Sequence, residues 1–208
     1  MLEVSPYLVG IGCGKRILVS AVTFPSCALE VLHAGAQVVL ADVDPASWTL
    51  PPQIARAAAE HTQIDAVTPV AAYGVPLPTP NWDAFSLEPG IPVIIDAAAA
   101  IDSQSPPEGG LIAHSLHATK PFGISEGGVL AGRDSEVIAK VRQLTNFGVI
   151  NRVSHTDGTN AKMSEYHPAV GRLIPTAVCR CASRRKCKDF NRPVKKGDFN
   201  VRPASKHP

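Results

Sequence analysis

The chain has 208 residues, of which 45% are hydrophobic and 5% aromatic, enough to bury a sizeable core in one domain or two small ones. No apolar run reaches the roughly 18 residues that a membrane-spanning helix needs. The first residues also lack the basic start, apolar run and small-residue cleavage site of a signal peptide. These features predict a soluble, cytoplasmic protein with no membrane partner.

Charge divides the chain into two unlike parts. Residues 1–172 carry a balance of −6 and residues 173–208 a balance of +8, although the whole chain carries only +2. Such asymmetry is typical of a tail attached to a folded region. The tail shows no sustained helical or strand period, so we expect it to be mostly disordered. Its charge would bind nucleic acid only non-specifically.

The tail also contains three cysteines and a histidine that could suggest zinc, namely Cys179, Cys181, Cys187 and His207. Structural zinc sites use Cys-x₂₋₄-Cys spacing with a second matching pair, and neither is present here. We therefore predict no metal site. The remaining cysteines, Cys13 and Cys27, are isolated, which does not suggest a secreted disulfide framework.

The predicted elements begin after a glycine run and then alternate between strands and helices. Gly10, Gly12 and Gly14 lack the Gly-x-Gly-x-x-Gly spacing of a phosphate-binding turn, and we interpret them as a loop. Ser26 is expected to cap the first helix. The apolar patterns predict strands at 16–20, 37–42, 64–70, 92–95, 111–116 and 128–131, and helices at 26–34, 52–60, 81–86 and 135–146.

The strands are apolar without alternation of polar and apolar residues, as expected when helices cover both faces of a sheet. The pattern predicts an α/β fold with three layers around a mainly parallel sheet, in which 128–131 is the hairpin partner of 111–116. Ligands of such sheets bind beyond the carboxyl ends of the strands. Asp96 lies at such an end.

Asp96 and Lys120 form the candidate catalytic pair. Lys120 is followed by the glycine-rich run Gly123 to Gly128, which would let a bulky ligand approach the backbone. A lysine and a carboxylate suggest pyridoxal 5'-phosphate (PLP), because the lysine can form a Schiff base and the aspartate can hold the protonated ring nitrogen. A solvated surface lysine and an aspartate that caps a turn explain the same residue types. From residue types, both interpretations stay open.

Two further residues could contact such a cofactor. The hydroxyl of Ser115 could bond a phosphate oxygen, or it could be satisfied at a strand end. Phe24 could stack on a flat ring, or it could belong to the core, which is the more common use of a lone aromatic residue. The residue types do not decide between these alternatives.

Ordered motifs between about Gly10 and Arg172 resemble those of a known family. These motifs are Val19 to Phe24, Ala34-Gly35-Ala36 with Asp42-Val43-Asp44-Pro45, Pro69 to Gly74, Val93 to Ala98, Ser115 to Lys120, Glu126-Gly127-Gly128 and Gly158 to Glu165. Together they resemble the DegT/DnrJ/StrS-type sugar aminotransferases, which are fold-type I PLP enzymes of the aspartate aminotransferase superfamily. The resemblance implies transfer of an amino group, commonly from glutamate, to a keto sugar carried on a nucleotide.

The resemblance also implies roles for five residues. Lys120 would be the Schiff-base lysine and the general acid and base. Asp96 would pair with the pyridine nitrogen, Phe24 would stack on the ring and Ser115 would bond the phosphate. Asn160 would reach the phosphate of the neighbouring subunit's cofactor, which implies a homodimer.

The chain departs from the family pattern in several places. Ala99 stands where the family usually has a cofactor-contacting glutamine. The family's upstream Gly-Thr or Gly-Ser phosphate turn and its C-terminal small domain have no counterpart. We therefore expect a chain truncated at both ends, with a partial PLP-binding large domain at 1–150, a polar segment at 151–172 and the basic tail at 173–208. An alternative function is a non-catalytic aminotransferase remnant with a charge-driven binding tail.

Overall fold

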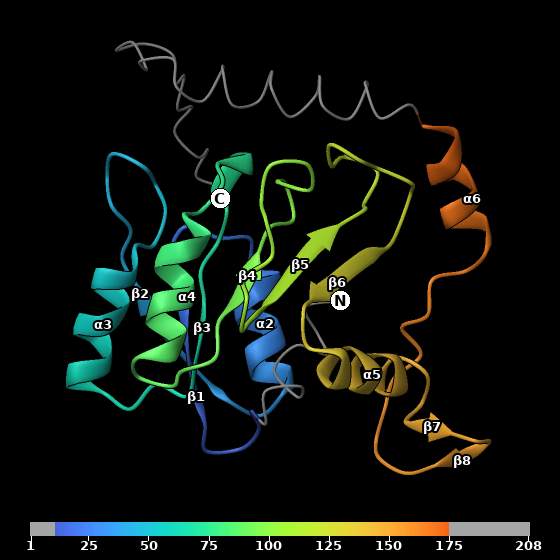
Figure 1. Cartoon of the computed structure of the whole chain (residues 1–208), viewed down its shortest axis with the longest axis horizontal. Coiled ribbons are helices and arrows are strands. Elements are labelled where there is room, and N and C mark those ends of the chain that lie inside the picture. The colour runs from blue at the N-terminus through green and yellow to red at the C-terminus, as the bar shows by residue number, and fades with distance from the viewer. Residues whose placement is uncertain (1–10, 175–208) are drawn as a thin grey trace, which may run out of the picture.

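The computed structural model describes residues 11–174 (Figure 1). The predicted disorder and the cysteine cluster of the tail fall on residues 175–208, outside the described residues, as does Gly10. The elements, in chain order, are β1 (Arg16–Ser20), α2 (Ser26–His33), β2 (Gln37–Ala41), α3 (Pro52–His61), β3 (Ala66–Thr68), the 3₁₀ turn η2 (Ala72–Gly74), α4 (Thr79–Leu87), β4 (Ile94–Asp96), β5 (Leu111–Ser115), β6 (Gly128–Gly132), α5 (Ser135–Leu144), β7 (Val149–Ile150), β8 (Val153–Ser154) and α6 (Tyr166–Leu173).

The strands β1 to β6 lie side by side and are mainly parallel. β1 pairs in parallel with β2 and β3, and β4 pairs in parallel with β5, whereas β6 runs antiparallel to β5 as a hairpin. Parallel bridges from Val67 to Val93 and from Val70 to Asp96 place β3 beside β4. The strand order is therefore β2-β1-β3-β4-β5-β6, and the prediction of a mainly parallel sheet with a hairpin at β6 is confirmed.

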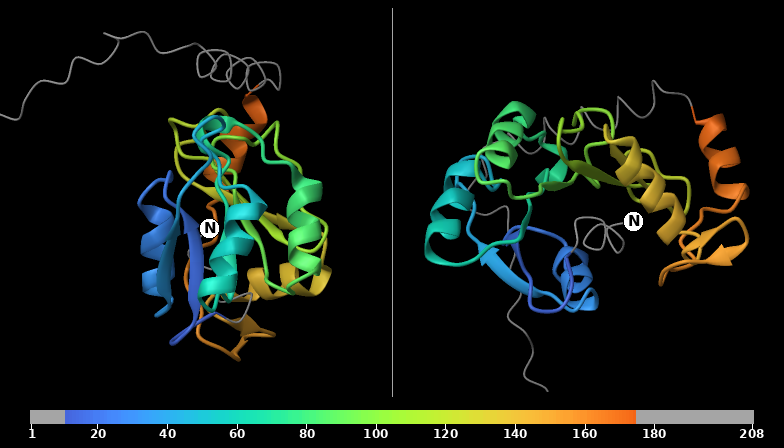
Figure 2. Two further views of the ribbon diagram at one scale, coloured as in Figure 1. Left: turned by 90° about the vertical axis from the view of Figure 1, so that its left-hand side faces the viewer. Right: turned by 60° about the horizontal axis from the view of Figure 1, so that its bottom comes forward.

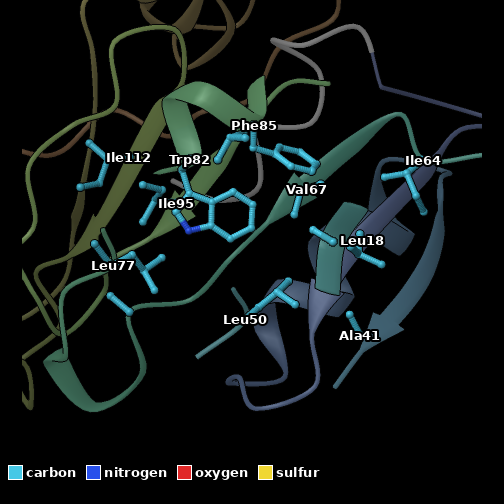
Figure 3. Close-up of a cluster of buried hydrophobic side chains, with 14 of the residues drawn as sticks. Leu18, Ala41, Leu50, Ile64, Val67, Leu77, Trp82, Phe85, Ile95 and Ile112 are labelled. Carbon is cyan, nitrogen blue, oxygen red and sulfur yellow. The ribbon is translucent and has the colours of Figure 1, made fainter. Parts of the chain in front are cut away.

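One face of the sheet packs against α3 and α4. Successive side chains of a strand point to opposite faces, so every second residue of the central strands contributes here. Leu18, Val67, Ile95 and Ile112 form a buried cluster with Trp82 of α4, as Figure 3 shows. This cluster contains residues of β1, β3, β4 and β5 and so packs the strands of the sheet together.

The opposite face packs against α2 and α5. Ile17 and Val19 of β1 contact Val31 of α2, while Ile94 and Leu111 belong to a cluster with Val141 and Leu144 of α5. The helices thus lie on both sides of the sheet, with α2 on the side away from α3 and α4 (Figure 2). This arrangement confirms the expected three layers. Within residues 11–174, no helix is long and apolar enough to cross a membrane.

Several element boundaries differ from the sequence prediction. Ser26 was expected to cap α2, but this is wrong, because Pro25 occupies the N-cap position with helical dihedral angles and no side-chain cap forms. A capping side chain needs an extended backbone. The third strand ends at Thr68, since Pro69 has no N–H to donate. The polar segment contains the unpredicted helix α6, which buries none of its residues.

Candidate functional site

Asp96 is the centre of the candidate site. It is the last residue of β4 and its side chain is almost completely buried, with 3% exposed. The Cys27 thiol donates to its Oδ2 at 2.9 Å, and the Ala98 backbone N–H donates to its Oδ1 at 2.9 Å. Among the described residues no cation forms an ion pair with it. A buried carboxylate of this kind suits a ligand that brings its own positive N–H.

The strand end fixes the backbone on both sides of Asp96. Its N–H donates to the Pro69 carbonyl at 2.9 Å, and its own carbonyl accepts from the Ala71 N–H at 2.8 Å. The following residue, Ala97, donates to the Ala113 carbonyl of β5 at 2.8 Å. The carboxylate therefore projects from a backbone held by the segments on either side of β4.

Lys120 lies in the loop that joins β5 to β6. Its N–H donates to the His117 carbonyl at 2.8 Å, which closes a tight turn, and Ala118 N–H donates to the Ser125 carbonyl at 2.7 Å. A Cβ added to Gly123 would overlap the backbone of Ala118, so only glycine allows the loop to fold back this closely. The glycine-rich run thus holds the lysine in a compact loop.

Two cavities meet at Lys120 and Asp96. Their volumes are about 530 and 500 Å³. Five residues line both cavities, namely Phe24, Asp96, Ala98, Thr119 and Lys120. The candidate lysine, carboxylate and aromatic ring therefore face one continuous space.

The second cavity also brings Ser115 to the site, together with the backbone of Gly127 and Gly128. The Ser115 Oγ accepts from the His117 N–H at 3.3 Å. Asn160 does not line either cavity; it forms an antiparallel bridge with Asn146, next to the end of α5. The structure thus gathers four of the five predicted site residues and places the fifth elsewhere.

Sequence reasoning missed several residues that line the cavities. His114 contacts the Ala97 carbonyl through Nδ1 at 3.1 Å. Burial lowers the pKa of His114, although the Ala97 carbonyl and the charge of Asp96 oppose this shift. His117 contacts the Thr119 hydroxyl at 3.0 Å through Nδ1 and Glu126 at 3.4 Å through Nε2. The proximity of these residues to Lys120 in the sequence was the one available signal.

Cys27 was noted only as an isolated cysteine. It lies one turn after Phe24, at the start of α2, and is 3% exposed. Burial raises the pKa of its thiol well above the usual value, and the negative charge of Asp96 adds to this. Nothing in the sequence indicates its contact with Asp96, which is 69 positions away.

The comparisons with known proteins agree with this geometry. The sequence profile of the DegT/DnrJ/EryC1/StrS aminotransferase family matches residues 2–187. The fold defines the class as a fold-type I aminotransferase architecture. The chain belongs to the DegT/DnrJ/EryC1/StrS aminotransferase family.

Individual relatives give more detail. Protein Rv3402c of Mycobacterium tuberculosis is 32% identical over 86% of this chain and 47% of its own length. The dTDP-4-amino-4,6-dideoxy-D-glucose transaminase of Shigella dysenteriae is 31% identical over 78% of this chain and 46% of its own length. The S. venezuelae protein DesV, solved with a ketimine intermediate, has a TM-score of 0.77 at 25% identity over 88% of this chain and 50% of its own. The chain thus spans about half the length of the curated relatives it matches.

Proposed function

We propose that this chain carries the PLP-binding part of an aminotransferase that transfers an amino group from an amino acid to a keto sugar carried on a nucleotide. The single observation that carries the proposal is that Lys120 and Asp96 line the same two cavities, with the Asp96 carboxylate buried and without an ion-pair partner among the described residues. PLP, when bound, supplies an electron sink for the substrate carbon that carries the amino group.

The residues present fit this cofactor. Asp96 would hold the proton on the ring nitrogen, since a buried carboxylate favours an adjacent positive charge. Lys120 would hold the cofactor covalently through its Nζ, and its amine, once displaced by the substrate, would serve as the general base and acid. Phe24 would cover one face of the ring, and Ser115 would donate its hydroxyl to the phosphate.

The substrate class follows from the family and from its relatives. The Shigella relative is named for a nucleotide-linked amino sugar, and we propose the same class of substrate here. We propose glutamate as the amino donor and the cytoplasm as the location. Tyr73, which lines the first cavity, offers an aromatic surface that a sugar could contact.

We further propose a homodimer in which Asn160 reaches the cofactor phosphate of the neighbouring subunit. Its position outside both cavities of its own chain supports this arrangement. Residues 1–150 would form the cofactor-binding part, 151–172 the segment that reaches across the dimer and 173–208 a basic tail. The dimer would be tested by sedimentation of the wild-type chain with and without PLP.

The cofactor assignment is tested by titrating the purified chain with PLP and following its visible absorbance. We expect saturable binding that Lys120→Ala abolishes and that Lys140→Ala, a control at an exposed lysine of α5 outside both cavities, leaves unchanged. Release of 2-oxoglutarate from glutamate then tests the first half of the transfer. Saturable binding that persists unchanged in Lys120→Ala would contradict the proposal.

A second candidate is a non-catalytic aminotransferase relative. It is favoured by Ala99, which lines the first cavity where the family usually supplies a glutamine to the cofactor. This candidate predicts that the folded chain releases no 2-oxoglutarate even at saturating PLP. This candidate would bind polyanions through the basic charge of its tail, which lies outside the described residues. Deletion of residues 173–208 would abolish this binding.

A further inference from the structure

We infer that Cys27 is a positioning residue, whose thiol holds the Asp96 carboxylate in the orientation that meets the ring nitrogen of bound PLP. This inference rests on the proposed function. Cys27 is buried and takes no part in the amino-group transfer proposed for Lys120 and Asp96.

The thiol donates its proton to the Asp96 carboxylate. Cys27 is the second residue of α2 and Asp96 is the last residue of β4, so the contact of 2.9 Å joins a helix to a strand end across the side of the sheet that α2 covers. The helix is anchored on this face by Val31, which packs in the same cluster as Cys27, Ile17 and Val19. The position of the donor is therefore set by the core of the protein.

The two hydrogen-bond donors to Asp96 bond to different oxygens of its carboxylate. Cys27 bonds to Oδ2 and the Ala98 N–H bonds to Oδ1, each at 2.9 Å. An aspartate side chain rotates easily about its terminal bond, and donors on both oxygens stop that rotation. An ionised carboxylate has about four lone-pair sites, which leaves free sites for a third donor. A ring N–H in the shared cavity is the donor for which these sites are suited.

The electrostatics make the thiol a permanent donor. Burial raises the pKa of Cys27, and the negative charges of Asp96 and Glu30 raise it further, against a lowering contribution from a hydrogen bond with Thr23. At neutral pH the sulfur therefore keeps its proton and remains a hydrogen-bond donor to Oδ2 of Asp96.

The test compares two replacements of Cys27. Cys27→Ser keeps a hydrogen-bond donor, whereas Cys27→Val replaces it with a somewhat larger apolar side chain that has no donor. Measured by absorbance titration of the full chain with PLP, we expect Cys27→Val to weaken binding about tenfold, which corresponds to 1.4 kcal/mol, and Cys27→Ser to stay within about threefold of wild type. Melting of each variant without PLP separates this effect from a loss of folding.

A second measurement detects the hydrogen bond between Cys27 and Asp96 directly, in the absence of the cofactor. In a chain whose other cysteines are replaced by serine, the Raman S–H band of Cys27 should lie at the low frequency of a strongly bonded thiol and should shift upward in Asp96→Ala. The replaced cysteines are Cys13, Cys179, Cys181 and Cys187.

Each outcome is decisive. Wild-type affinity in a folded Cys27→Val variant overturns the positioning role while leaving the proposed function intact. An S–H band at the frequency of a free thiol overturns the contact. A wild-type chain that binds no PLP overturns the proposed function and this inference with it. Weakened binding in Cys27→Val, together with rescue by Cys27→Ser, supports the inference.

Discussion

The Trp82→Phe substitution tests the packing on which the site is built. Trp82 is fully buried between the sheet and α4, and its ring meets Phe85 edge to face with centroids 5.4 Å apart (Figure 3). Its indole Nε1 has no hydrogen-bond acceptor among the described residues. The tryptophan thus combines a large apolar contribution with one buried polar atom whose hydrogen bond is missing.

The two contributions of Trp82 can be weighed separately. Trp82→Ala should cost about 3–5 kcal/mol of unfolding free energy, as expected for a large core aromatic residue. Trp82→Phe leaves a void of roughly 40 Å³, which costs about 1 kcal/mol at about 24 cal/mol per Å³. It also removes an unpaired N–H that costs about 1–3 kcal/mol. We therefore expect Trp82→Phe to lie within about 1–2 kcal/mol of wild type.

The measurement is urea unfolding of wild type, Trp82→Phe and Trp82→Ala, followed by far-ultraviolet circular dichroism so that loss of tryptophan fluorescence does not interfere. We expect the free energy of unfolding of Trp82→Phe to be clearly higher than that of Trp82→Ala. If Trp82→Phe proves as destabilising as Trp82→Ala, the indole N–H has a partner that stabilises the fold, and the reasoning is refuted.

Three smaller predictions concern α5, the β7–β8 hairpin and the site. Asp134→Ala should cost about 1 kcal/mol in urea unfolding, because Asp134 caps α5 by accepting from the N–H groups of Glu136 and Val137; an unchanged midpoint would contradict this. Arg152→Gly should raise stability by about 0.5–1 kcal/mol, since Arg152 has a φ of 65° that glycine adopts without strain; a lower melting temperature would refute it. His114→Gln should make the free energy of unfolding depend less on pH under acidic conditions. Burial lowers the pKa of His114, so the unfolded chain takes up the proton first and stability falls as pH drops below about 6.5; an equally steep fall in the variant would exclude His114 as the cause.

Much of the fold could be predicted from the sequence because its signals are local. The apolar runs of β1 and β5 and the apolar face of α5 were placed to within a few residues. Asp96 was expected at a strand end, and the structure has it as the last residue of β4. Helix α6 was missed although Tyr166, Ala169 and Val170 recur at helical spacing, because the pattern spans only eight residues and includes Pro168 and Gly171, which disfavour a helix.

The site was predictable only in part, because its geometry depends on contacts between distant segments. The glycine-rich run marked Lys120 as unusual, and the structure brings it to Asp96 and Phe24 as expected from the family resemblance. The contact between Cys27 and Asp96 joins residues 69 positions apart, so it depends on how α2 packs across the sheet. A local sequence pattern cannot predict a contact between residues so far apart in the chain. The role of Asn160 depends on a second chain and stays a prediction.

The measurement that most directly tests the central claim is chemical trapping of the cofactor on the folded chain. Sodium borohydride added to the protein with limiting PLP fixes the cofactor to the lysine it occupies, and peptide mass mapping then locates it. We predict that the phosphopyridoxyl group lies on Lys120, and that Asp96→Ala lowers this labelling while Lys140→Ala does not. Labelling spread evenly over surface lysines such as Lys140 and Lys162, with no preference for Lys120, would contradict the account.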